Sequence, residues 1–357
     1  MKKKKHQFVR VLTPIASVAL FVYFLRRTGT ASITDSARAL GWGFALLILL
    51  SGLRHALRTA AWHVSIEPGT PRPGLLELFG LRLVGEALNG ATPAGPLLGE
   101  SVKTWAASKS MRGSSSASSV VIENIIYGLG AGLFMLSGAV LLLAAASPRA
   151  RLGSWTVATC LVASLLVPWA ILRRRTALAT ALLDHLPATS RLKRFLAPYE
   201  PTIKAVEAEV RDFFLTRRGA FICILGLELL TNFTGVAEAY LILSVTTFHA
   251  SLLTAYLVEV AYRAVQLFFA FVPFGLGVEE GGAAGALRAL GYNASQGVSL
   301  AILRRARSVF WAALGLLFAA RYCVARPGDD AQVEPIGCRV GVTIDAKLRP
   351  MEEGSAL

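Results

Sequence analysis

The sequence FVPFGLGVEEGG, residues 271–282, interrupts the apolar part of the chain and decides the fold that we expect. It follows a long apolar run and precedes a short helical pattern. Proline lacks a backbone donor and glycine is conformationally permissive, so together they break a helix here. Two carboxylates, Glu279 and Glu280, follow next to segments with the composition of lipid-buried helices. Because irregular backbone and charge are costly at membrane depth, this stretch predicts a functional site.

A second stretch, NGATPAGPLLGE at residues 89–100, repeats the same order of residue types. Both stretches contain a proline, a glycine, a second glycine and then a glutamate. Many transporters build a binding site from two broken helices that face each other near the middle of the membrane. The pair therefore predicts two broken or re-entrant helices, an internal repeat, and one site shared by Glu100 and Glu279. Glu280 has no counterpart in the first stretch, so we expect it to be a solvated neighbour.

The composition is that of a polytopic membrane protein. The chain has 357 residues, of which 54% are hydrophobic and only 17% charged, and its mean hydropathy is +0.54; soluble domains rarely have such values. Its four cysteines are scattered singly, without the spacing of a metal site or a disulfide framework, so we expect no metal and no cofactor. The net charge of +15 comes from basic residues at the ends of apolar segments. That pattern is typical of topology signals and anionic-lipid contacts, and it argues against nucleic acid as a partner.

The apolar runs predict an all-α membrane helix bundle of about seven spans, or eight if one broken element crosses the bilayer. The predicted spans are residues 11–25, 39–53, 120–146, 155–172, 220–245, 252–272 and 296–322. Residues 75–88 are apolar but short, so we expect a re-entrant or interfacial helix in which Arg82 and Glu86 share one face. Residues 283–290 predict a short helix that the sequence Gly291-Tyr292-Asn293 closes.

Basic residues predict the topology. The N-terminal residues 1–10 carry a lysine cluster, and a signal peptide is one interpretation of this start. No small-residue cleavage site precedes the arginines at 26–27, which favours an uncleaved first span with a cytoplasmic N-terminus. Arginine clusters at both ends of residues 173–218 predict a cytoplasmic loop, with a helix over 201–215. We therefore expect a transmembrane domain over 11–323 and a disordered tail over 324–357.

Several polar residues fall inside the predicted spans, which favours the bundle interior over a lipid face. Glu259 and Arg263 are four residues apart, so we expect an intrahelical ion pair. Arg54 and Arg58 also share one helix face, and two interpretations stay open: snorkelling at the interface, or binding of a lipid phosphate. We expect His55 to be interfacial.

Residues 109–132 predict a polar return followed by a packed helix. The serine-rich residues 114–119 follow several basic residues and suggest the return. Gly128 and Gly132 have the small-xxx-small spacing that allows two membrane helices to pack closely.

The two broken stretches resemble the lysylphosphatidylglycerol synthase transmembrane-region family, also described as the flippase-like domain. That family shows an asparagine followed by Pro-Gly and Gly-Glu in its first half, and Pro, Gly, Gly and Glu followed by an arginine-bearing helix in its second. The matching residues here are Asn89, Pro93, Gly95, Gly99, Glu100, Lys103, Glu123, Pro273, Gly275, Gly277, Glu279, and Arg304 or Arg305. The resemblance covers roughly residues 10–323. One departure is Asn124, where many members carry arginine after the mid-helix glutamate.

The resemblance implies movement of a lipid or lipid-linked molecule between leaflets of a bacterial inner membrane. Relatives are associated with aminoacylated phosphatidylglycerol, with hopanoid export or with glycolipid pathways, so the implied partners are membrane lipids and lipid-biosynthesis enzymes. In full-length synthases a soluble catalytic domain follows the membrane region. Because only about 35 polar residues follow here, we expect no aminoacyl transfer and no enzyme activity.

Physical chemistry supports the same mechanism. The N–H groups exposed at half-helix ends favour an anionic headgroup, and the glutamates just after the breaks lie near those ends. Arg263, Arg304 and Arg305 then neutralise the carboxylates or bind a phosphate. Two alternatives stay open. One is a membrane scaffold whose acids and arginines are packing ion pairs, and the other is an intramembrane lipid-modifying enzyme that uses Glu100 and Glu279 as acid and base.

Overall fold

The computed structural model describes residues 40–89, 95–145, 194, 197–246, 250–269 and 277–325. Helices are the regular elements of this part of the chain, which confirms the all-α prediction. The elements are α3 (Trp42–Ser65), α4 (Leu75–Asn89), α5 (Gly95–Ala107), α6 (Gly113–Ala145), η1 (Ala197–Tyr199), α10 (Glu200–Thr216), α11 (Arg218–Thr246), α12 (Leu252–Phe268), α13 (Val278–Ala289) and α14 (Ala294–Ala325).

Three described helices are long and apolar enough to cross a membrane: α3, α6 over Gly113–Leu141, and α11 over Arg218–Val245. They correspond to three of the predicted spans. The predicted spans at 11–25 and 155–172 lie outside the described residues, as do the basic start and nearly all of the predicted tail. The helix predicted within the cytoplasmic loop is α10, and α14 continues three residues past its predicted end.

Each broken stretch joins two short helices that fold back on each other. In the first hairpin, Ser110, three residues after the end of α5, donates to Glu77 of α4 at 3.3 Å, and a Cβ on Gly85 would lie 3.2 Å from the Gly99 carbonyl oxygen. The second hairpin pairs α12 with α13, and Gln266 donates to Glu279 at 3.4 Å. These contacts make both hairpins antiparallel. With 15 residues or about 22 Å, α4 is too short to cross a hydrocarbon core of about 30 Å.

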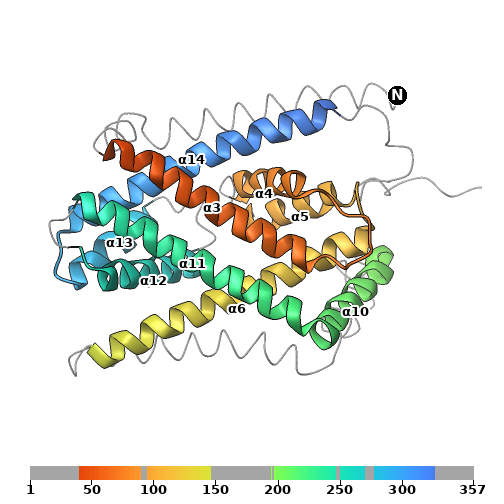
Figure 1. The fold of residues 1–357 in the computed structure, drawn as a ribbon, viewed down its shortest axis with the longest axis horizontal. Helices are drawn as coiled ribbons and strands as arrows, with labels where there is room; N and C mark the ends of the chain where they lie inside the picture. The colour runs from red at the N-terminus through yellow and green to blue at the C-terminus, as the bar shows by residue number, and fades with distance from the viewer. Residues whose placement is uncertain are drawn as a thin grey trace, which may run out of the picture.

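The order of helices occurs twice in the chain. A long helix, a short hairpin and a second long helix appear as α3, α4–α5 and α6, and again as α11, α12–α13 and α14. The two first helices, α3 and α11, pack against each other across the middle of the molecule (Figure 1). The hairpins are exchanged between the halves, because α4 packs on α14 and α12 packs on α6. The structure therefore agrees with the predicted internal repeat.

The helix ends follow local sequence signals. Ser251 caps α12 by accepting from the Thr254 backbone N–H at 3.0 Å. Gly277 precedes α13 with φ of 79°, a conformation that favours glycine, and Gly291 (φ 86°) follows its end as predicted.

Two predictions about α6 were wrong: the polar return at residues 114–119, and close helix packing at Gly128. The serine-rich residues 114–119 are the first turns of α6 and not a polar return, because their hydroxyls bond to backbone carbonyls and allow close packing. Ser119 also accepts from the Trp62 indole at 3.1 Å, which fixes α3 against α6. Gly128 has no neighbour within 4 Å of an added Cβ, whereas Gly130 faces Glu228 and Gly138 faces Val260.

Candidate functional site, a buried polar belt

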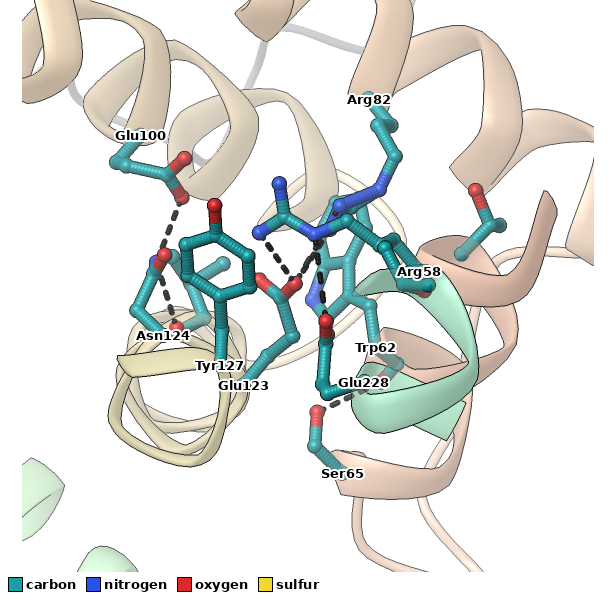
Figure 2. Close-up of polar contacts among 12 residues, drawn as sticks. Arg58, Trp62, Ser65, Arg82, Glu100, Glu123, Asn124, Tyr127 and Glu228 are labelled. Atoms are coloured by element: carbon teal, nitrogen blue, oxygen red, sulfur yellow. Dashed lines mark hydrogen bonds and ion pairs between the residues drawn. The ribbon is translucent and has the colours of Figure 1, made fainter. Parts of the chain in front are cut away.

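Three cations from three helices converge on the carboxylate of Glu123, which is completely buried on α6 (Figure 2). Arg82 of α4 and Arg58 of α3 approach its Oε1 atom at 2.6 and 2.9 Å. Lys103 of α5 lies 3.7 Å from its Oε2 atom. A buried carboxylate is stable only when it is paired and hydrogen-bonded, and these contacts provide that.

Further carboxylates surround this centre. Glu100 accepts from Lys103 at 2.7 Å and from Asn124 at 2.9 Å. Arg58 also contacts Glu86 at 3.4 Å and lies 3.7 Å from Glu228 of α11.

A second group of charges joins α11, α12, α13 and α14. Glu259 of α12 accepts from Arg263 at 3.1 Å and from Arg304 of α14. Arg304 also donates to the Gly235 carbonyl of α11 at 3.2 Å. A side chain at Gly235 would collide with the Glu259 carboxylate, so the close packing of α11 on α12 requires glycine there.

The neighbouring arginines of α14 pair with other helices. Arg305 pairs with Glu280 of α13, and Arg307 pairs with Glu238 of α11. Arg54 of α3 lies 4.0 Å from the same Glu238 carboxylate.

Tyr127 connects the two groups. Its hydroxyl accepts from Arg263 at 3.0 Å, and the Arg58 guanidinium lies 4.0 Å from its ring centroid. The contacts form one continuous buried arrangement, which we call the polar belt. It comprises Glu100, Lys103, Glu123, Arg82, Arg58, Glu228, Tyr127, Arg263, Glu259 and Arg304.

The two halves of the repeat contribute equivalent ion pairs with the charges exchanged. Arg82 is the eighth residue of α4 and pairs with Glu123, the eleventh residue of α6. Glu259 is the eighth residue of α12 and pairs with Arg304, the eleventh residue of α14. The same two helix positions therefore carry a cation and an anion in one half, and an anion and a cation in the other.

The family model of the lysylphosphatidylglycerol synthase TM region matches residues 10–315, which is most of the chain. The chain belongs to this family. It is accordingly an integral membrane protein, in agreement with its three apolar helices of membrane-spanning length. No curated protein and no solved structure matches the chain.

Several residues that the family resemblance singled out lie together in the belt. Glu100, Lys103 and Glu123 form one contact group, and Arg304 belongs to the other, together with Arg263, which the physical argument had added. The predicted intrahelical pair of Glu259 and Arg263 is confirmed. Asn124, the predicted departure from the family pattern, donates to Glu100 through its amide.

Other predicted residues serve the hairpins. Gly277 precedes α13, whereas Gly95 begins α5 and Gly99 lies within it, so neither of these two breaks a helix. Asn89 is the last residue of α4 and faces Gly99. Three predicted residues lie outside the described part of the chain: Pro93, Pro273 and Gly275.

The two motif carboxylates occupy different places. Glu100 lies on α5, which packs on α4 and α6, whereas Glu279 lies on α13, which packs on α12 and α14. Figure 1 shows α5 and α13 in separate parts of the molecule. The structure therefore does not bring together the two carboxylates of the predicted shared site, although both hairpins pack on α6 and α14. Glu280 is also not a solvated neighbour, since it pairs with Arg305 and caps α13 through the Gly277 N–H at 2.9 Å.

The structure also changes the interpretations of His55 and Arg58. His55 is buried against the ring of Trp311 and is not interfacial. Arg58 does not snorkel, because it lies among three carboxylates.

The sequence analysis assigned no binding role to Arg82, Tyr127, Glu228 or Glu259. For Arg58, binding of a lipid phosphate was one of two open interpretations. A signal was present for most of them: they are ionisable residues inside apolar runs, where charge is rare and usually functional. Tyr127 gave no such signal.

Proposed function

We propose that this protein moves an anionic lipid between the leaflets of the membrane, with the lipid headgroup passing along the polar belt while the acyl chains stay in the bilayer. Membership of the lysylphosphatidylglycerol synthase TM region family supports a membrane role. The placement in a bacterial inner membrane with a cytoplasmic N-terminus, and the absence of a chemical step, belong to the same proposal.

One observation carries the choice of an anionic headgroup. Five buried guanidinium nitrogens on α12 and α14 have no hydrogen-bond acceptor among the described residues: Arg263 Nη2, Arg304 Nε and Nη1, and Arg305 Nε and Nη2. An unsatisfied buried donor costs about 1–3 kcal/mol, and more when it is charged. Phosphate oxygens match the planar donors of arginine, so a phosphate-bearing headgroup is the ligand class that would satisfy several of them together.

The exchanged ion pairs support passage as well as binding. In both halves, a short hairpin helix and a long helix hold one carboxylate against one cation. A phosphate that reaches either cation competes with a carboxylate for it, so the headgroup exchanges one set of partners for an equivalent set. Such an exchange keeps the barrier lower than passage through hydrocarbon, where no partner exists.

Purified protein in liposomes tests the proposal. Head-labelled phosphatidylglycerol should cross faster than in empty vesicles and faster than head-labelled phosphatidylcholine. Arg305→Gln should slow the anionic lipid by roughly 10- to 100-fold, the effect of one charged hydrogen-bonded contact. Arg288→Gln, on the exposed face of α13, is the matched control and should leave the rate unchanged. If neither lipid crosses faster than in empty vesicles, the chain is a scaffold and the transport proposal fails.

A further inference from the structure

Glu228 is the carboxylate of the polar belt that lacks a close donor. It lies on α11 with its side chain completely buried. Neither of its carboxylate oxygens has a hydrogen-bond partner among the described residues. The cation that contacts it is Arg58, whose Nε lies 3.7 Å away, which is longer than a hydrogen bond. Its own helix does not supply a side-chain donor either, because the Asn232 amide bonds to the Glu228 backbone carbonyl.

The cations near Glu228 have closer carboxylate partners. Arg58 from α3 approaches Glu123 at 2.9 Å and Glu86 at 3.4 Å. Arg82 from α4 faces Glu228 as well, but it approaches Glu123 at 2.6 Å. From α6, the charged group that faces Glu228 is Glu123 itself, which repels a second negative charge. Figure 2 shows the Glu123 and Glu228 side chains on either side of the contacts to Arg58.

The charges of this part of the belt do not balance. Together with Glu86, which contacts Arg58 from beside the belt, three cations and four carboxylates meet there: Arg58, Arg82, Lys103, Glu86, Glu100, Glu123 and Glu228. Two carboxylates that share one site seldom both ionise, because each raises the free energy of the other's charged form. One bound proton restores the balance. It also gives Glu228 a hydroxyl donor, and the Oε2 atom of neighbouring Glu123 is a hydrogen-bond acceptor to which no described residue donates.

We propose that Glu228 is a proton-binding site that couples lipid movement to proton movement across the membrane. This inference rests on the proposed transport function. The reaction is the binding of one proton to the ionised carboxylate from one side and its release to the other side, with no other bond changed.

The coupling follows from the shared guanidinium. When Glu228 is neutral, one negative charge leaves the surroundings of Arg58, so Arg58 pairs more readily with an anionic headgroup. By linkage, the headgroup then strengthens proton binding by the same factor. Protonation and headgroup binding therefore favour each other, and the anion crosses together with a proton.

Infrared difference spectroscopy tests the proton without requiring transport. The wild-type protein at neutral pH should show the carbonyl stretch of a protonated carboxylic acid in a water-excluded site. Glu228→Gln should remove that band, and Glu67→Gln, in the exposed loop between α3 and α4, should retain it. Absence of the band from the wild type, or its persistence in Glu228→Gln, overturns the proposal whether or not the protein moves lipid.

Liposomes that enclose a pH-sensitive dye test the coupling. With an inward proton gradient, the wild type should take up protons only when phosphatidylglycerol is present, and the gradient should change the lipid rate by about 5-fold or more. Glu228→Gln, which resembles the protonated side chain, should move lipid at a rate that does not depend on pH and should carry no protons. Lipid movement without proton uptake in the wild type, or proton uptake by Glu228→Gln, contradicts the coupling but leaves the transport function standing.

If no lipid moves at all, the transport function fails and with it the coupling, and the infrared band still decides whether Glu228 binds a proton.

Discussion

Glu123 is the residue on which the first half of the polar belt depends, because it neutralises cations from α3, α4 and α5. Arg82 is 1% exposed and donates a hydrogen bond to Glu123. A buried cation whose partner is removed loses its pairing energy but keeps its desolvation cost. Removal of Glu123 therefore affects all three of the cations that it neutralises.

Glu123→Gln should lower the free energy of unfolding by about 3–5 kcal/mol, because the amide leaves Arg82 without an ionised partner and leaves Arg58 with only its longer contacts to Glu86 and Glu228. Thermal unfolding in detergent, followed by tryptophan fluorescence, measures the loss against Glu67→Gln as the exposed control. Replacing the pair together, as Glu123→Gln with Arg82→Met, should recover part of the stability. A melting temperature equal to that of the control would contradict a structural role for Glu123.

At this scale the sequence predicted contacts within one helix and missed contacts between helices. Spacing placed Glu259 and Arg263 on one face, and they do pair. The same reasoning placed Arg82 and Glu86 on one face, but Arg82 pairs with Glu123 of α6 and Glu86 with Arg58 of α3. A helical period gives the side on which a charge lies, whereas the partner depends on which helix packs against that side.

At the scale of helices, Gly99 of the first broken stretch acts by close packing. A Cβ on Gly99 would collide with the Asn89 side-chain oxygen and lie 2.5 Å from the Gly85 carbonyl oxygen. The α4–α5 hairpin therefore closes only because Gly99 has no side chain, as in other closely packed membrane helices. A glycine is expected both where a helix breaks and where two helices pack closely, so the sequence alone did not distinguish the two.

Gly99→Ala should separate α4 from α5 and lower the free energy of unfolding by roughly 1–3 kcal/mol, the usual cost of overpacking. Gly128→Ala is the matched control, since nothing lies within 4 Å of an added Cβ at that position of α6. Alanine is the better helix former there, so this control should be neutral or stabilising by up to about 1 kcal/mol. Denaturation of the two purified variants makes the comparison, and equal stability of both would contradict the close hairpin.

The existence of the helices was predictable because long apolar runs leave few alternatives, and α11 lies within two residues of its predicted bounds. The bounds of the others were less predictable: α3 ends at Ser65, past the predicted end at residue 53, and α13 begins at Val278, before the predicted start at residue 283. The start of α6 was not predictable, because serines favour turns in water but pack well where two helices meet. Their small size allows the Trp62 indole to reach Ser119. The tertiary contact decided the local structure.

At the scale of the whole molecule, the two motifs proved to mark two structural halves and not two walls of one pocket. Exchange of the hairpins places α4 on α14 and α12 on α6, so each half completes the packing of the other. The order of residue types predicted the repeat. It carried no information on the exchange of the hairpins between the halves, which depends on how the long helices α3 and α11 pack against each other.

Tyr127 is the connection between the halves of the belt, so its hydroxyl tests whether the belt is one route. Tyr127→Phe keeps the ring under Arg58 and removes only the acceptor of the Arg263 hydrogen bond. A hydrogen bond to a charged group contributes about 1.5–3 kcal/mol, so phosphatidylglycerol movement in liposomes should slow by roughly 10-fold or more. Tyr256→Phe is the control: it loses the hydroxyl contacts to Ser137 at 2.6 Å and to the Phe134 carbonyl at 3.3 Å, but lies outside the belt. Transport by Tyr127→Phe at the wild-type rate, or an equal loss in both variants, would show that the headgroup does not pass from one half of the belt to the other.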